Sequence, residues 1–486
     1  MGARKELDRA AGRRSLVAAS ARRVMRRFGV GGSDHLTYPA PERFVEAFDG
    51  ATLRSHLALR SPLGATQALS LFINIPPQRR VDAANRWGAG RTCSAEPIDA
   101  YLGLIYRELD LLMGPLGDRR AVNQVWIAGG AGRLFPGESL PQLMSELRSR
   151  FELSRNGDFG IDVDPAAVSI ADIATIAQLG FNRIDLGQVG FDQRTEHQPP
   201  DSSVPFQPDR TRQSGRAAIE DFARVITAAR QVGVRSVATA LHYGVPAQSV
   251  AAFDRALCEL IGLNPDRIVL RHYSYRLPGM PRIDRRADLP DLATCVDMLI
   301  HGRSLLHAAG YVEIGLEQFV RRDDDLDQVA RRGLLLRSLL GFSRLPEFDR
   351  LGVGLGAISR IGGIYAQNMV YLEDYESCLS QQVLPVMRGI ELTRDDLVRG
   401  AVISALIGRG EVSIESIAIA HLISFSDHFS REMEKLAVME EAGLVELSPD
   451  WISVTPQGRL VVRAICALFD RHASRALERR ALTELN

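Results

Sequence analysis

Three short segments of small and polar residues each follow or end an apolar run that is typical of a buried strand. They occupy residues 74–77 (Asn-Ile-Pro-Pro), 128–132 (Ala-Gly-Gly-Ala-Gly) and 161–165 (Ile-Asp-Val-Asp-Pro). In folds built from strand–helix repeats, ligands bind beyond the carboxyl ends of the strands, where small residues let the backbone approach them. Gly129 and Gly130 also suit an ordinary tight connection, because the glycine spacing of a nucleotide-binding loop is missing.

Two histidines and two aspartates also lie at or near the carboxyl ends of predicted strands. His242 and His272 follow neighbouring predicted strands, so a shared haem or zinc site is one hypothesis, although structural histidines are the simpler interpretation. Asp162 and Asp164 alternate along one predicted strand, which sends one side chain into the barrel and the other towards an outer helix. This alternation argues against a carboxylate pair for acid–base catalysis.

The cysteines are widely separated and form no CxxC motif. They are Cys93, Cys258, Cys295, Cys378 and Cys466. A disulfide framework or a local zinc or iron–sulfur motif needs clustered thiols, whereas isolated cysteines behave as small buried apolar residues. We therefore predict structural roles for all five and no metal site.

Alternation of short apolar runs with amphipathic segments predicts the elements that position these residues. Strands are predicted at 69–75, 124–127, 159–163, 183–186, 236–241 and 267–271, with helices at 97–113, 140–150, 171–178, 217–231 and 249–261. Six such repeats favour an α/β fold, a partial (β/α)6 TIM-like barrel. Helices at 395–407, 425–441 and 459–478, with a hairpin of residues 444–447 and 452–454, predict a helical, winged-helix-like C-terminal domain.

The predicted organisation has five parts, which are a basic N-terminal tail (1–28), an N-terminal arm (29–67), the partial barrel (68–310), a barrel extension with a substrate-side segment (311–385) and the C-terminal domain (386–486). The tail has no clear apolar face. We expect a solvated extension whose removal changes stability by less than about 1 kcal/mol, with docking on a membrane surface or an acidic partner as the alternative. The acidic run at 323–325, flanked by arginines, is predicted to be a solvated surface turn.

Charge and hydropathy exclude several classes of protein. Lys and Arg total 59, as do Asp and Glu, so no overall field favours nucleic acid as a partner. Hydrophobic residues make up 45% of the chain, which suits a folded protein rather than a disordered one. We find no run of 18 apolar residues and no secretory signal, and so expect no transmembrane segment and a cytoplasmic location.

An ordered set of segments extends over residues 37–470. It includes 69–76 (LSLFINIP), 351–354 (LGVG), 357–359 (AIS), 365–368 (YAQN) and 388–396 (RGIELTRDD). The set resembles the oxygen-independent coproporphyrinogen III oxidases, a family of radical S-adenosylmethionine enzymes. The resemblance implies the same barrel, oxidative decarboxylation of coproporphyrinogen III to protoporphyrinogen IX, and a place in porphyrin and haem biosynthesis. It also implies cofactor contacts at Phe72, Gly129, Gly130, Asp162, Ile358 and Arg212, the last with Arg216 as the alternative register.

The loop after the first strand departs from the family pattern. In the family, a CxxxCxxC loop holds three irons of a 4Fe-4S cluster and leaves the fourth iron to chelate S-adenosylmethionine. Gln78, Asp82 and Asn85 stand at those positions. Amide and carboxylate groups do not match the affinity of thiolates for such a cluster. We therefore predict that the 4Fe-4S cluster is absent and that no residue is catalytic, while binding of S-adenosylmethionine stays an open question.

Further family positions depart in the same direction. Beside the loop, Phe72 replaces a Tyr and Asn74 a His, and Asp162 shortens a Glu. The remaining replacements are Ala128 for Gly, Val189 for Gln, Ala240 for Asp and Leu339-Leu340 for Phe-Gln. Together these changes remove polar groups but leave the framework, which is the pattern of a pseudoenzyme.

The favoured interpretation is a cluster-less relative that binds a tetrapyrrole at the barrel mouth, or regulates the pathway. Arg271, Arg276 and Arg282 are candidates to bind propionate groups bidentately. Two alternatives stay open. One is an inactive partner subunit of an intact oxidase, and the other is an active oxidase that works by another route.

Overall fold

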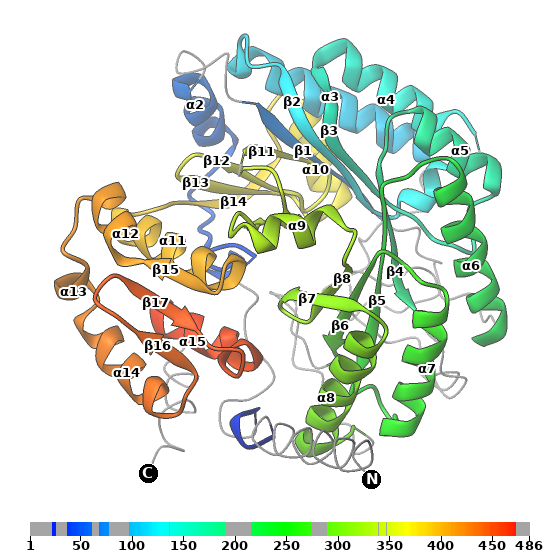
Figure 1. Ribbon diagram of the computed structural model, residues 1–486. Helices are drawn as coiled ribbons and strands as arrows, with labels where there is room; N and C mark the ends of the chain where they lie inside the picture. The colour runs from blue at the N-terminus through cyan, green and yellow to red at the C-terminus, as the bar shows by residue number, and fades with distance from the viewer. Residues whose placement is uncertain are drawn as a thin grey trace.

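A parallel sheet with helices along one face forms the centre of the molecule (Figure 1). The computed structural model describes residues 22–25, 36–60, 68–76, 97–135, 137–189, 215–273, 289–338, 340–346 and 348–472, with only the backbone at 188–189 and 215–217. The strands are β1 (Leu69–Ile75), β2 (Ala121–Gly129), β3 (Glu152–Asp162), β4 (Arg183–Val189), β5 (Ser236–Tyr243) and β6 (Arg267–His272). They are neighbours in chain order, which confirms the predicted α/β partial barrel.

Helices connect these strands and cover the outer face of the sheet. They are α3 (Ile98–Leu116), α4 (Ser139–Arg150), α5 (Ile170–Gln178), α6 (Gly215–Gln231) and α7 (Val250–Gly262), followed by α8 (Leu292–Ala308) after β6. Ser169 caps α5, because its side chain accepts a hydrogen bond from the Asp172 amide and the Asp172 carboxylate binds back to the Ser169 amide. This capping box explains why the helix begins where the sequence predicts.

Further strands extend the sheet at both edges. One edge carries β8 (Gln318–Arg321) and β7 (Tyr311–Gly315), and the other carries β11 (Asp349–Val353), β12 (Ile358–Ile361), β13 (Ile364–Asn368) and β14 (Val386–Glu391). β14 starts at the predicted beginning of the C-terminal domain, yet it is the edge strand of the main sheet. Val45 of the N-terminal arm pairs with Gly389 on β14. A separate hairpin is formed by β9 (Leu336–Ser338) and β10 (Gly341–Ser343).

Smaller elements complete this part of the chain. They are η1 (Pro41–Arg43), α2 (Gly50–Arg60), η3 (Ala131–Leu134), α9 (Asp325–Arg331) and α10 (Leu372–Ser380). Within the described residues, no helix has both the length and the apolar character needed to cross a bilayer.

The C-terminal part is helical with a small sheet. It contains α11 (Arg394–Gly408), β15 (Glu411–Ser413), α12 (Ile414–His421), α13 (Phe425–His428), α14 (Ser430–Glu441), β16 (Val445–Leu447), β17 (Trp451–Val454), η5 (Gly458–Val461) and α15 (Val462–Phe469). The predicted hairpin gains a third strand, β15, and the helix predicted at 425–441 is interrupted at Phe429. The last predicted helix ends at Phe469 rather than continuing to 478, and residues 473–486 lie outside the described part. A bidentate ion pair of Arg463 with Glu317 joins α15 to the turn between β7 and β8.

The end of the N-terminal tail is packed against the core, contrary to the predicted solvated extension. Residues 22–25 are helical, and the side chains of Val24 and Met25 are buried in the hydrophobic core. The Arg22 guanidinium pairs at 2.6 Å with Asp297 on α8. The prediction was wrong at these residues because two buried side chains on a short helix produce no periodicity that a sequence can reveal.

We therefore expect Met25→Ala to lower the free energy of unfolding by about 2–5 kcal/mol, the range for truncating a buried Met. Urea denaturation followed by circular dichroism measures the change. Arg23→Ala, at an exposed position of the same turn, is the control and should stay within about 0.5 kcal/mol of the wild type. Equal stability of the two variants would show that the helix at 22–25 is not docked.

Candidate functional site

β1 sends alternate side chains to the two faces of the sheet. Leu71 and Ile73 are fully buried in the core, whereas Phe72 and Asn74 are partly exposed on the opposite face. That face is the interior of the partial barrel. Strand register arranges the interior positions in three rows. We call them the base row (Ser70, Gln124, Asp158 and Arg350), the middle row (Phe72, Trp126, Gly160, Gly352 and Ile358) and the strand-end row (Asp162 and Asp185).

The middle row is apolar. Phe72 lies in register with Trp126 on β2 and with Gly352 on β11, and Gly352 in turn lies against the backbone of Ile358 on β12. On the other side, the Trp126 ring covers Gly160 on β3 so closely that a Cβ at residue 160 would overlap it. Two predicted cofactor positions, Phe72 and Ile358, therefore share this row.

The strand-end row holds a pair of carboxylates. Asp162 ends β3, and its Oδ1 and Oδ2 each accept a hydrogen bond at 3.0 Å, from the Trp126 indole and the Gly129 amide respectively. Asp185 on β4 lies directly beside Asp162 in the parallel register. The second carboxylate next to Asp162 is thus Asp185 and not Asp164, which lies past the end of β3 and accepts a hydrogen bond from the Ala166 amide.

Both acids hold their protons more tightly than usual. Burial raises the pKa of Asp162, and the neighbouring Asp185 carboxylate raises it further. Burial also raises the pKa of Asp185, despite a hydrogen bond from the Gly187 amide and the charge of Arg271. The sequence analysis did not single out Asp185. Its position between Ile184 and Leu186, which face the helices, could have indicated that its side chain points into the barrel.

We expect Asp185→Asn to stabilise the protein at pH 8 and not near pH 4. Because the folded-state pKa values are raised, the pair favours folding when protonated, and this contribution is lost as the pH rises above about 4. An asparagine keeps an acceptor for the Gly187 amide and removes one charge, so the gain at pH 8 should be roughly 1–2 kcal/mol, about one pKa unit. Urea denaturation at the two pH values measures it. The exposed Asp118→Asn is the control, and a pH-independent effect of D185N would contradict the pairing.

The glycine segment closes on the end of β1. Gly129 has φ +81°, and a Cβ there would overlap the Ile75 carbonyl, which accepts a 2.5 Å hydrogen bond from the Gly130 amide. Asn74 joins the same strand end to the loop that follows β11, because its side-chain amide donates a hydrogen bond to the Leu355 carbonyl at 2.7 Å. Close packing of backbone on backbone therefore accounts for glycine at 129.

The two histidines do not face one mouth. His242 lies on β5 in register with Arg271, on the interior side, whereas the next residue, Tyr243, points to the other face. The His272 ring lies 5.1 Å from the Tyr243 ring, on that other face. Burial lowers the pKa of His272 to about 4, so its imidazole is neutral at physiological pH. The hypothesis of a shared haem or zinc site is wrong for this pair.

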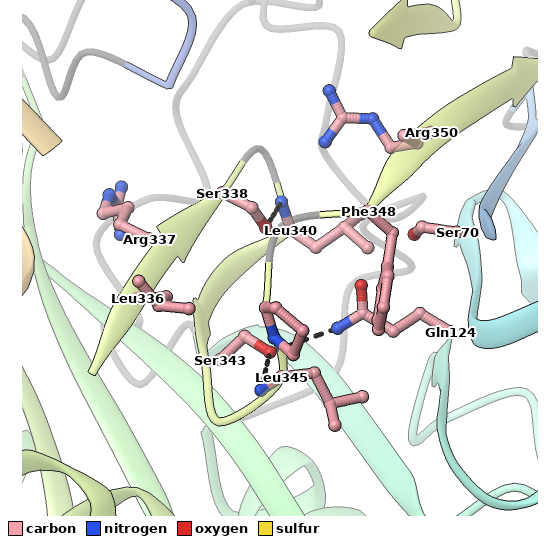
Figure 2. Close-up of a pocket in the computed structure, with 11 residues that line it drawn as sticks. Ser70, Gln124, Leu336, Arg337, Ser338, Leu340, Ser343, Leu345, Phe348 and Arg350 are labelled. Carbon is pink, nitrogen blue, oxygen red and sulfur yellow. Dashed lines mark hydrogen bonds between the residues drawn. The ribbon is translucent and has the colours of Figure 1, made fainter. Parts of the chain in front are cut away.

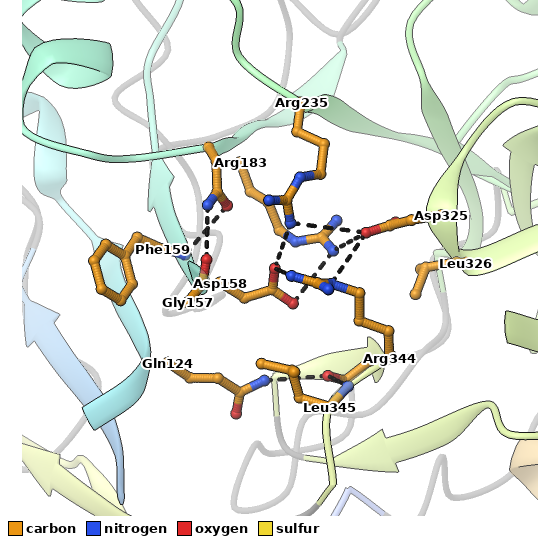
Figure 3. Close-up of polar contacts among 12 residues, drawn as sticks. Gln124, Gly157, Asp158, Phe159, Arg183, Arg235, Asp325, Leu326, Arg344 and Leu345 are labelled. Atoms are coloured by element: carbon orange, nitrogen blue, oxygen red, sulfur yellow. Dashed lines mark hydrogen bonds and ion pairs between the residues drawn. The ribbon is translucent and has the colours of Figure 1, made fainter. Parts of the chain in front are cut away.

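An ionic network closes the base of the sheet (Figure 3). Asp158 on β3 accepts from Arg235 at 2.9 Å, Arg344 at 3.2 Å and Arg183 at 3.3 Å. Asp325 at the start of α9 pairs with Arg183 at 3.0 Å and with Arg267 at 2.8 Å. Its neighbour Asp324 also binds Arg267, at 2.8 Å, and its side chain is only 2% exposed.

The acidic run at 323–325 is therefore not a solvated surface turn. Asp323 alone matches that prediction, with a side chain 70% exposed and paired with Arg321. Local composition could not reveal the burial of the other two acids, because their arginine partners come from β4 and β6, far away in sequence.

Comparison with known proteins decides the family. A scan against protein-family models finds no match. The oxygen-independent coproporphyrinogen III oxidase of Pseudomonas aeruginosa is 32% identical over 457 residues, covering 92% of this chain and 95% of the relative. The Escherichia coli oxidase is 30% identical over 453 residues, covering 92% and 94%. This chain belongs to the oxygen-independent coproporphyrinogen III oxidase family. A solved structure of coproporphyrinogen III oxidase from Escherichia coli, described as a radical SAM enzyme, matches with a TM-score of 0.78 at 29% identity, over 90% of this chain and 97% of that one.

Four of the six cofactor positions predicted from this oxidase family lie in the interior rows or beside them. They are Phe72 and Ile358 in the middle row, Asp162 in the strand-end row, and Gly129, whose amide binds Asp162. Gly130 continues the same loop. Ala240 lies in register between Gln188 and Val269. Their contacts with a cofactor stay predictions.

The remaining predicted positions lie outside the described residues. These are Gln78, Asp82, Asn85, Cys93, Arg212, Arg276, Arg282 and Leu339, and only the backbone is described at Val189 and Arg216. Arg271 is described and exposed on β6. Within the oxidase family site, the described groups thus comprise an apolar middle row, a carboxyl pair and one exposed cation at the mouth.

Proposed function

We propose that this chain is a cluster-less member of the oxidase family that binds a tetrapyrrole in the cytoplasm and serves as a carrier or regulator in porphyrin and haem biosynthesis. The observation that carries the proposal is the donor set Gln78, Asp82 and Asn85 at the positions where the family has cysteines. A 4Fe-4S cluster is held by thiolates, and amide or carboxylate groups do not provide comparable affinity. Without a cluster, no electron reaches S-adenosylmethionine, so ordinary radical chemistry stops at its first step.

The described cysteines offer no replacement ligand set. Cys295, Cys378 and Cys466 lie on three different helices, α8, α10 and α15, and Cys258 is exposed on α7. Burial raises the pKa of the first three, to about 11 for Cys295. Because the thiolate is the ligand, thiols that keep their protons bind iron poorly. The donor groups of the described cysteines therefore do not fit a 4Fe-4S cluster.

The interior suits a flat apolar ring with acidic side chains. Phe72, Trp126 and Ile358 form an apolar row below the strand ends, and the exposed Arg271 stands at the mouth next to His242. A macrocycle packs on aromatic and aliphatic side chains, and a guanidinium binds a carboxylate with two parallel hydrogen bonds. These features support a tetrapyrrole with propionate groups as the ligand class.

Anaerobic reconstitution with iron and sulfide tests the first half of the proposal. We expect iron and sulfide to remain below stoichiometric amounts after desalting, with no broad absorbance near 400 nm. A stoichiometric cluster would overturn the proposal and favour an active oxidase.

A coproporphyrin III titration followed by Soret absorbance tests the second half. We expect saturable binding, weakened about tenfold in Arg271→Met, because a charge-assisted hydrogen bond contributes roughly 1.5–3 kcal/mol. Arg255→Met, an exposed arginine on α7, is the matched control and should bind like the wild type. If no Soret shift occurs and a pull-down recovers an intact oxidase, the chain is instead an inactive partner subunit.

A further inference from the structure

A buried arginine at the base of the barrel has no acidic partner among the described residues. Arg350 on β11 is 4% exposed, its Nη2 lacks any hydrogen-bond partner, and its Nε reaches only the Ile358 carbonyl, at 3.3 Å. Burial lowers the pKa of Arg350 to about 10, so the guanidinium is still charged at neutral pH. A buried charge without a counter-ion is strongly unfavourable, so this position calls for an anion.

The next strand adds a second polar atom without a partner. Ser70 on β1 lies in register with Arg350, is 3% exposed, and has an Oγ with no hydrogen-bond partner. Ser70 is also in register with Gln124 on β2, and Gln124 with Asp158 on β3, which completes the base row. Two neighbouring side chains in one row therefore both offer unused donors.

These side chains line a pocket between the sheet and the β9–β10 hairpin (Figure 2). The pocket is narrow, with room for about one water-sized group. Ser343 accepts hydrogen bonds from the Gln124 side chain at 3.1 Å and the Leu345 amide at 3.0 Å, and Ser338 accepts one from the Leu340 amide at 3.1 Å. Both hydroxyls accept, so their hydrogens can point to a ligand. Among the residues that the structure describes, the lining contains two arginines, Arg350 and Arg337, and no acid.

Two described carboxylates, one next to Arg350 in sequence and one in its row, bind other arginines. Asp349 precedes Arg350 but points to the other face, where it pairs with Arg60 and Arg119, both at 2.8 Å. Asp158 is in the base row but three strand spacings away, about 14 Å, and is already contacted by three guanidiniums. Neither can neutralise Arg350 directly.

We propose that this pocket binds a small monoanion, a carboxylate group or a halide ion, between the Arg350 guanidinium and the Ser70 hydroxyl. Ser70 lies four residues before Asn74, so the pocket is about 13 Å below the strand-end row and is distinct from it. Two sources share this chemistry. One is a free monoanion, and the other is a propionate arm of a bound tetrapyrrole, which rests on the proposed function.

Thermal unfolding of the full chain in acetate or chloride tests the proposal, with the bulky sulfonate MES at equal ionic strength as the reference. We expect the melting temperature of the wild type to rise by about 2–4 °C at a hundredfold excess of anion over its dissociation constant. Arg350→Met should abolish this rise, and Ser70→Ala should weaken acetate binding several-fold in calorimetry. Arg255→Met on α7 should behave like the wild type.

A measurement without variants guards against misfolding of R350M. In ³⁵Cl NMR, the wild type should broaden the chloride signal, and acetate should reverse the broadening. If anions raise the melting temperatures of the wild type and R350M equally, or if neither acetate nor chloride has any effect on the wild type, the proposal is wrong.

Competition between acetate and coproporphyrin III would identify a propionate as the occupant, whereas anion binding without competition would identify a free monoanion. If the tetrapyrrole fails to bind, the acetate result still decides the anion pocket.

Discussion

Restoring three cysteines together, as Q78C/D82C/N85C, is expected to give iron–sulfur cluster binding without coproporphyrinogen oxidation. The three thiolates supply the missing iron affinity, because they recreate the family's CxxxCxxC spacing after β1. Activity should stay undetectable, since the groups that orient cofactor and substrate are separate from those that hold the cluster.

The structure adds a reason for this separation. Asp162, where the resemblance implies a longer family Glu, accepts hydrogen bonds from Trp126 and Gly129 and lies beside Asp185, whose negative charge favours the protonated form of Asp162. A protonated acid attracts the cationic part of a cofactor weakly. The family resemblance implies polar groups at the positions of Ala240 and Leu339-Leu340, where this chain has apolar side chains. Misplacement by about 1 Å can cost around a hundredfold in rate, and several such losses compound.

The test is an anaerobic assay of the triple variant with reductant, S-adenosylmethionine and coproporphyrinogen III, with the vinyl product followed by chromatography. The serine triple Q78S/D82S/N85S is the matched control, which should bind no cluster. Appreciable protoporphyrinogen from the cysteine variant would mean that the thiolates alone had been missing and that the other replacements are neutral.

Asp158→Asn is expected to cause the largest loss of stability among single changes at the base of the sheet. The carboxylate of Asp158 is 7% exposed and accepts from Arg183, Arg235 and Arg344 (Figure 3). The asparagine amide keeps the shape of the side chain but has no charge. One oxygen that accepted hydrogen bonds from the guanidiniums is also replaced by an NH2 group, which can only donate. Removing one partner from a buried ion pair costs about 3–5 kcal/mol, because the opposite charge is left uncompensated.

Urea denaturation followed by circular dichroism measures this loss. Asp323→Asn is the matched control, since Asp323 is also paired with an arginine but its side chain is 70% exposed. Exposed pairs contribute about 1 kcal/mol or less, so D323N should remain close to the wild type. If D158N loses less than about 1 kcal/mol, the network does not stabilise the fold in the way its geometry indicates.

Local patterns were enough to predict the barrel elements. Each of the six parallel strands contains apolar residues in a strand-like pattern, and most of the helices between them end near glycine or proline, so short windows of sequence carry the information. The same reasoning placed Gly129 and Asp162 at strand ends, whereas Phe72 was singled out only by the family resemblance. It failed for the helix at 425–441, where one amphipathic pattern covers two helices that meet at Phe429.

Pairings between distant segments could not be predicted in this way. Asp185 reaches Asp162 through the register of β3 with β4, and Arg350 reaches Ser70 across 280 positions of sequence. A shift of one residue in either register would send these side chains to opposite faces, and no local pattern specifies it.

The burial of particular charged side chains could not be predicted from the sequence either. Asp323, Asp324 and Asp325 are consecutive aspartates, yet only the Asp323 side chain is mostly exposed, because Asp324 and Asp325 pair with the arginines at the start of β4 and β6. The sequence by itself determined the strand–helix order, the family and the absence of cysteine at 78, 82 and 85. Only the tertiary structure decided which charges are buried together and that Arg350 has no acidic partner within the described part of the chain, because those contacts form when strands distant in sequence pair and pack.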